Sequence, residues 1–301
     1  MQSLQPKDPT AGVEPTATAI TAMVKPFDKK VLIVLPFYKS VHPITAMCVS
    51  QLLDRRRTAT MLHFGDAFVT HSRNTCADFF LQSNLEWALW LDDDMVVPFG
   101  NAQWYKVYTG WKEYPEPFAS LNALDRLLSH GKTIVGGLYR GRHNGAGAVY
   151  NEGANPGPER DYAFAGPYDL IKPTRWVGTG CMLTHRSVFE DIEKRFPHLG
   201  RKENGRGGNW FTSSEHQAMD FIVKTRDMLA DGPMTGEKAH AALTMMEAAL
   251  HDAKANSGLG FGEDVQFCVR ALQAGHQPFV DMGLFVGHIG HRVFGPAKYQ
   301  V

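Results

Sequence analysis

The stretch LEWALWLDDDMVVPFG, residues 85–100, places three consecutive aspartates between two apolar segments. The apolar run before them is typical of a buried strand, so Asp92, Asp93 and Asp94 are expected at its carboxyl end. Three like charges this close repel one another, and where water is scarce they need a cation or bound protons. Taken alone, such a triplet is also compatible with a solvated loop or a helix N-terminus.

The segments before this stretch alternate between strand and helix patterns. An apolar run from Val31 to Leu35 predicts a buried strand that stops at Pro36, and Pro43 suits the first turn of the helix that follows. A second strand is predicted over residues 58–65 and a second helix over residues 70–83. This order predicts an α/β sheet with right-handed crossovers, in which ligands bind outside the carboxyl ends of the strands.

The rest of the chain continues in the same way but with longer interruptions. Strands are predicted near residues 132–142, 174–185 and 278–292, and a helix after residue 262 ends near Gly275. We expect residues 1–26 to form a mobile tail and residues 27–301 a single domain. A glycine-rich functional loop is expected over residues 141–170, and a helical insertion over about residues 216–256.

The composition narrows the class of protein without naming a function. Lysine plus arginine equals aspartate plus glutamate at 31 each, so the formal charge is zero and nothing indicates a nucleic-acid partner. The four cysteines lie far apart with no C-x-x-C pair, which favours free thiols in a reducing compartment. With no apolar run long enough to span a bilayer and no signal peptide, the expected location is the cytoplasm.

Two further short motifs carry chemistry-bearing side chains. Glu263 and Asp264 follow a glycine at the start of a predicted helix, where acidic residues also serve simply to stabilise the first turn. A carboxylate there could instead act as a general base. His288 and His291 follow the last apolar strand in FVGHIGHR, where a histidine is more often structural but can be a metal ligand.

Taken in order, these motifs resemble those of the GT-A fold glycosyltransferases, over roughly residues 31–292. LDDD resembles the family's D-x-D motif, GED its x-E-D motif, VGHIG its C-terminal histidine motif, and WVGTGCMLTH its glycine-bearing loop. The resemblance implies a Rossmann-like, mixed but mostly parallel sheet flanked by helices. It also implies that a divalent ion, Mn²⁺ or Mg²⁺, and a nucleoside diphosphate sugar are bound.

The resemblance assigns a role to each motif. The implied metal ligands are Asp92, Asp94 and His288, although the triple aspartate leaves open which two of its positions act. Asp264 is the implied general base, and Glu263 the residue beside it that contacts the acceptor. The implied donor-binding residues are Pro36, Tyr38, Arg73, Asn74, Asp92, Asp93, Gly178, Thr179 and Gly180, with Trp176 at the start of the glycine loop.

The predicted function is metal-dependent sugar transfer, from a UDP-sugar first of all, to an acceptor hydroxyl. Inversion at the anomeric carbon is favoured, and retention stays open because some retaining relatives share the acidic residue and the VGH-like ending. The acceptor stays open among a glycan, a lipid-linked sugar, a small molecule, a protein and a hydroxymethylated DNA base. Basic stretches at residues 55–57, 140–142 and 201–206 would serve DNA, but the neutral total charge argues against tight DNA binding.

Two other classes stay open. A nucleotidyltransferase shares the sheet and the acidic metal site, but LPFYKSVHP lacks the glycines of a phosphate loop. A non-catalytic sugar- or nucleotide-binding module is the other alternative, and substitution of Asp264 separates it from an enzyme.

Overall fold

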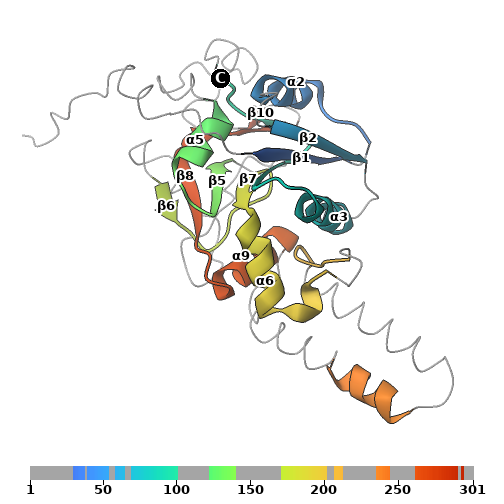
Figure 1. Cartoon of the computed structure of the whole chain (residues 1–301). Helices are drawn as coiled ribbons and strands as arrows, with labels where there is room; N and C mark the ends of the chain where they lie inside the picture. The colour runs from blue at the N-terminus through green and yellow to red at the C-terminus, as the bar shows by residue number, and fades with distance from the viewer. Residues whose placement is uncertain are drawn as a thin grey trace, which may run out of the picture.

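The computed structural model describes residues 30–37, 39–53, 58–64, 69–100, 122–139, 171–201, 207–212, 235–244, 262–290 and 293–294. The expected tail of residues 1–26 and the expected loop of residues 141–170 lie outside the described residues. Of the expected insertion at residues 216–256, the structure describes a helix over residues 236–244, which lies away from the sheet (Figure 1).

The chain forms a mixed α/β fold around a seven-stranded sheet of order β2-β1-β3-β7-β5-β8-β6. Strands β1, β2, β3, β5 and β8 run in one direction, while β7 and β6 run antiparallel to their neighbours. The sheet is therefore mostly parallel by strand direction, as predicted. The strands are β1 (Val31–Phe37), β2 (Thr58–Phe64), β3 (Trp87–Leu91), β5 (Ile134–Leu138), β6 (Ile171–Pro173), β7 (Cys181–His185) and β8 (Pro278–Phe285).

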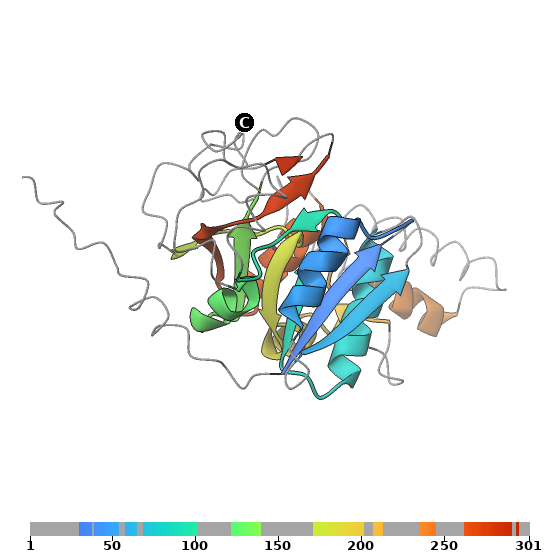
Figure 2. The ribbon, with the colours of Figure 1, turned by 90° about the horizontal axis from the view of Figure 1, so that it is seen from above.

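Helices cover both faces of this sheet (Figures 1 and 2). Helices α2 and α5 lie on one face, and α3, α6 and α9 lie on the other. The central strands β1, β3 and β5 are consequently buried along almost their whole length, which is why their sequences are continuous apolar runs. The helices are α2 (Pro43–Leu52), α3 (Val69–Gln82), α5 (Ala123–Ser129), α6 (Arg186–Arg195), the short 3-10 helix η3 (Pro197–Leu199) and α9 (Glu263–Gln273).

A second, three-stranded sheet of order β10-β9-β4 borders the main one. Its strands are β4 (Met95–Val96), β9 (Gly287–Ile289) and β10 (Val293–Phe294). Met95 pairs with His288 in the antiparallel β4–β9 ladder. This pairing brings the segment after the three aspartates against the C-terminal histidine motif.

The first strand is longer than predicted. Pro36 does not stop β1, which continues to Phe37 and pairs with β2 along all of its length. The ladder between β1 and β3 ends at Val34, so only β2 still pairs with β1 at Pro36. A proline is tolerated in a strand where one side carries no ladder, because its missing N–H then leaves no hydrogen bond unmade on that side.

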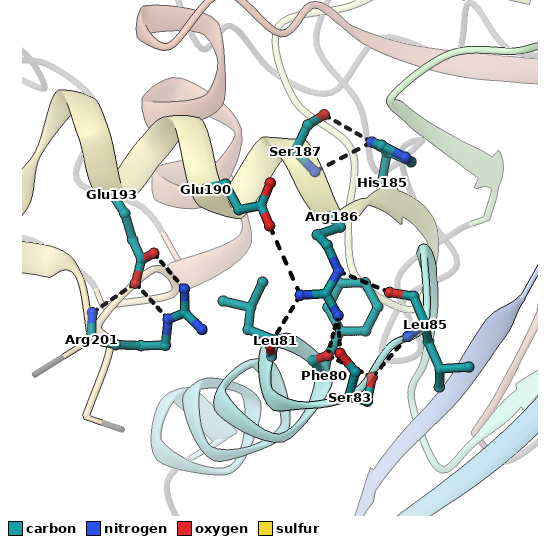
Figure 3. Close-up of polar contacts among 10 residues, drawn as sticks. All are labelled: Phe80, Leu81, Ser83, Leu85, His185, Arg186, Ser187, Glu190, Glu193 and Arg201. Atoms are coloured by element: carbon teal, nitrogen blue, oxygen red, sulfur yellow. Dashed lines mark hydrogen bonds and ion pairs between the residues drawn. The ribbon is translucent and has the colours of Figure 1, made fainter. Parts of the chain in front are cut away.

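An arginine at the start of α6 joins this helix to the end of α3 (Figure 3). The guanidinium of Arg186 donates hydrogen bonds to the backbone carbonyls of Phe80, Leu81, Ser83 and Leu85, at 2.5–2.9 Å. The last carbonyls of a helix have no partner within the helix, and here the arginine satisfies them. These contacts fix the approach of the chain to β3, at the end of that strand opposite the aspartates.

Candidate functional site

The candidate site lies where the carboxyl ends of β1 and β3 meet. The chain order reverses at these adjacent strands, since β2 and β3 flank β1 on opposite sides, and ligands of open α/β sheets bind at such a reversal. The backbone of the three aspartates is fixed from both sides. His42 N donates to Asp93 O at 2.9 Å, and Asp92 N donates to Gly180 O at 3.4 Å.

Arg73 connects three of the predicted segments. Its side chain, 5% exposed, leaves α3 and donates to Asp92 at 2.6 Å through Nη2, and to Glu263 through Nη1. Burial alone would lower the pKa of Arg73, but Asp92, Glu263 and Asp264 raise it above its ordinary value. The arginine therefore stays charged and holds the strand end of β3 against the first turn of α9.

The acidic pair at the start of α9 is not a simple helix cap. Gly262 occupies the N-cap and makes no side-chain cap hydrogen bond, while the Glu263 carboxylate reaches Arg73, 190 positions away in the sequence. Asp264 Oδ1 accepts a hydrogen bond from the backbone of Val265 at 2.8 Å. Burial, with a smaller contribution from Glu263, raises the pKa of Asp264 to about 6.

Asp94 and His288 form the second half of the site. Nε2 of His288 lies 3.3 Å from Oδ1 of Asp94, and both side chains are largely buried, at 13% and 15% exposure. Ile289 N also donates to Asp94 O at 2.8 Å. The resemblance implied that this aspartate and this histidine are ligands of one metal ion, and the β4–β9 ladder brings their side chains close together.

The predicted metal ligands fit a divalent ion in part. Among the described residues, no three histidine, cysteine or acidic side chains form a group that could hold a metal ion by themselves. Asp94 and His288 supply one oxygen and one nitrogen donor, whereas Asp92 is engaged by Arg73 and is 31% exposed. The carboxylate suits Mn²⁺ or Mg²⁺, whose other ligands would be water and phosphate oxygens, whereas the imidazole nitrogen favours a transition-metal ion such as Mn²⁺ over Mg²⁺.

The glycine turn before β7 packs closely against Tyr139. Gly178, Thr179 and Gly180 are all buried, and Gly180 N donates to Tyr139 Oη at 3.0 Å. A Cβ on Gly180 would lie 2.7 Å from Tyr139 Cζ, which is closer than real Cβ atoms approach. Only glycine fits this position without a shift of the aromatic ring.

The remaining predicted donor-binding residues divide into two groups. Asn74 is 6% exposed, and its carboxamide accepts from Phe211 N at 2.9 Å and donates to Thr212 Oγ1 at 3.2 Å. These contacts give Asn74 a structural role in holding the segment at residues 207–212. Pro36 is buried in β1 beside the site, and Tyr38 lies outside the described residues.

Of the basic stretches that would serve DNA binding, the structure describes a single residue, Arg201. Residues 55–57, 140–142 and 202–206 lie outside the described part of the chain. Arg201 forms a bidentate pair with Glu193, at 2.8 Å for both bonds (Figure 3). Its charge is thus balanced within the protein.

Sequence reasoning missed Tyr139 as a member of the site. The residue follows an apolar strand, where an aromatic side chain usually belongs to the core. The available signal was its position at the carboxyl end of a strand that ends in IVGGL, since two adjacent glycines leave space for close contacts on both faces.

Comparisons with known proteins give a distant structural likeness. No protein-family model matches the chain, and no curated protein matches it. Among solved structures, the chain is similar to one titled A197 from STIV, with a TM-score of 0.45 and 13% sequence identity, over 90% of this chain and 94% of that one. In the described residues, no helix has the length and apolar character needed to cross a membrane.

Proposed function

We propose that this protein is a metal-dependent glycosyltransferase that moves a sugar from a nucleoside diphosphate sugar to an acceptor hydroxyl. The observation that carries the proposal is the convergence of four distant segments on one strand end. Direct contacts join Asp92 to Glu263 through Arg73, Asp94 to His288, and Gly180 to Tyr139. Each of the four motifs that resembled the family contributes to this cluster.

Asp264 is suited to act as the general base. A carboxylate with a pKa of about 6 is mostly ionised at neutral pH and still accepts a proton readily. In the proposed step, Asp264 takes the proton of the acceptor hydroxyl while the acceptor oxygen forms a bond to the anomeric carbon. The bond from that carbon to the diphosphate oxygen breaks, and the diphosphate leaves with the electron pair. Attack from the face opposite the leaving group inverts the anomeric carbon.

The proposed roles of the other site residues follow from their contacts. Glu263 is held by Arg73, so this pair orients the first turn of α9 and with it Asp264. Asp94 and His288 would hold the divalent ion, which when bound supplies positive charge to the leaving diphosphate. The sugar would lie beside the glycine turn at residues 178–180, which contacts His288 through Tyr139.

Calorimetry with UDP and GDP, each in Mn²⁺ and then in EDTA, tests the donor site. We expect metal-dependent binding of one nucleotide, lost in Asp94→Ala and kept in Asp191→Ala, a control that removes an aspartate from the surface of α6. If neither UDP nor GDP binds, with Mn²⁺ or with EDTA, the proposal is wrong.

Asp264→Asn then separates an enzyme from a binding module. The variant should keep nucleotide affinity and lose sugar transfer by ~10²–10⁴-fold, the range that general base catalysis contributes. The protein is better described as a binding module if the wild type binds the nucleotide but consumes no nucleotide sugar with any acceptor offered. A variant as active as the wild type would remove Asp264 from the mechanism.

A further inference from the structure

Tyr139 contacts both halves of the candidate site. On one side its Oη accepts the Gly180 N–H at 3.0 Å. On the other side its ring meets the ring of His288 edge to face, with centroids 5.8 Å apart and an interplanar angle of 85°. At 6% exposure the tyrosine is enclosed by these neighbours, so neither the glycine turn nor the histidine can move far without displacing it.

The hydroxyl of Tyr139 keeps its proton under working conditions. Burial first, and then Asp92 and Asp264, raise the pKa of Tyr139 well above its ordinary value of 10.0. The contact with Gly180 is therefore a hydrogen bond to a neutral phenol at neutral pH. Gly180 O in turn accepts from Asp92 N, so the tyrosine is connected through the turn to the aspartates.

We infer that Tyr139 is a positioning residue that fixes the glycine turn relative to His288. The inference rests on the proposed function, in which the turn faces the sugar and His288 faces the diphosphate. The bond that breaks during transfer joins those two parts of the donor. A residue in contact with both sides sets how the anomeric carbon is aligned with its leaving group, and misplacement by about 1 Å costs up to ~10²-fold in rate.

Two substitutions separate the two contacts. Tyr139→Phe keeps the ring against His288 but removes the acceptor for the Gly180 N–H. We expect it to keep the Kd for UDP in Mn²⁺ within about twofold, while turnover falls by about tenfold or more. Turnover is measured with whichever of UDP-glucose, UDP-galactose and UDP-N-acetylglucosamine the wild type consumes. Tyr139→Leu removes both contacts and should weaken UDP binding as well.

Thr184→Val is the matched control. It removes another buried hydroxyl, on β7, which accepts from Trp90 Nε1 at 2.9 Å. This variant should lose stability to a similar degree as Tyr139→Phe but keep the turnover of the wild type. Equal turnover losses in both variants would mean that Tyr139 has only a structural role.

Hydrogen exchange of the Gly180 amide, followed in a peptide spanning residues 177–183, gives a readout independent of substrate. Exchange should rise in Tyr139→Phe and stay unchanged in Thr184→Val. If exchange of the Gly180 amide is faster in Tyr139→Phe but turnover is undiminished, the inference is overturned and the proposed function is not. Unchanged exchange in Tyr139→Phe has the same consequence. A wild type that binds neither UDP nor GDP in Mn²⁺ overturns the proposed function, and the inference with it.

Discussion

Replacement of Asp281 by asparagine should strongly destabilise the fold. Asp281 is fully buried on β8, where Arg126 donates to it from Nε and Nη2 at 2.6 and 2.7 Å, and His130 Nε2 lies 2.7 Å away. It also accepts from Gly283 N and Leu284 N, where the β5–β8 register shifts. The carboxylate thus holds an irregular stretch of β8 in place, just before the chain enters β9.

The expected cost follows from the charge that the substitution would leave behind. Arg126 is 6% exposed, and without the Asp281 carboxylate its buried cation loses two charge-assisted hydrogen bonds and the negative charge that faces it. Removing one partner of a buried pair costs about 3–5 kcal/mol. At roughly 2–4 °C per kcal/mol, the Tm at pH 7 should fall by roughly 6–20 °C.

The pH dependence provides a second, independent check. Burial would raise the pKa of Asp281, but hydrogen bonds from His130 and Arg126 lower it from 3.8 to about 2. A depressed folded-state pKa stabilises the protein above the unfolded value of 3.8, and this contribution is lost as the pH falls toward 2. The whole contribution is about 2 kcal/mol and is lost only below pH 2. At pH 3 the difference in unfolding free energy between wild type and Asp281→Asn should therefore be smaller than at pH 7 by about 1 kcal/mol.

Urea unfolding at pH 7 and pH 3, followed by circular dichroism, measures both effects. Asp191→Asn is the control, because Asp191 also contacts a cation and a histidine, Lys194 at 2.8 Å and His276 at 3.1 Å, but at the surface. That variant should unfold with a midpoint close to that of the wild type. The reasoning is refuted if Asp281→Asn is as stable as the wild type at pH 7. It is also refuted if the difference in unfolding free energy between the two proteins is as large at pH 3 as at pH 7.

Three other predictions concern the Arg186 contacts, the glycine turn and the base. Arg186→Met removes the donor to four carbonyls and should cost about 3 kcal/mol in urea unfolding, whereas no loss would show that water replaces it fully. Gly180→Ala forces a Cβ against Tyr139 and should cost about 1–3 kcal/mol, while Gly236→Ala, which meets nothing within 4 Å, should not lower the Tm. Because Asp264 must be ionised to act as a base, kcat/KM should rise with pH through about 6, and a profile flat from pH 5 to 7 would exclude it.

The sequence predicted the parallel part of the sheet because buried strands and crossover helices leave distinct patterns. The apolar runs of β1 and β3 and the helices between them follow periodicities that burial imposes. The direction of a strand leaves no such pattern. CMLTH in β7 has the same alternation whether it runs parallel or antiparallel to β3, so its reversed position between β3 and β5 could not be predicted.

The residues of the candidate site could be selected from the sequence, but the contacts between them could not be predicted. Asp92, Glu263 and Arg73 were all selected from short motifs, yet their ion pairs span 19 and 190 positions of sequence. Such pairs depend on how α3, β3 and α9 pack, which no local pattern specifies. Asn74 was selected together with its neighbour Arg73 as a donor-binding residue, but its carboxamide is engaged by the segment at residues 207–212.

The three aspartates have separate contacts in the structure. A divalent cation shared by Asp92 and Asp94 was predicted to offset the repulsion between their carboxylates, and this stays a prediction. Asp92 pairs with Arg73, Asp93 is tied through its carbonyl to His42, and Asp94 lies beside His288. Because Arg73 engages one oxygen of Asp92, the carboxylate of Asp94 and the imidazole of His288 are the ligands that we propose for a divalent ion. Replacement of Asp92 should therefore disturb the first turn of α9, and replacement of Asp94 should lower the affinity for the metal ion.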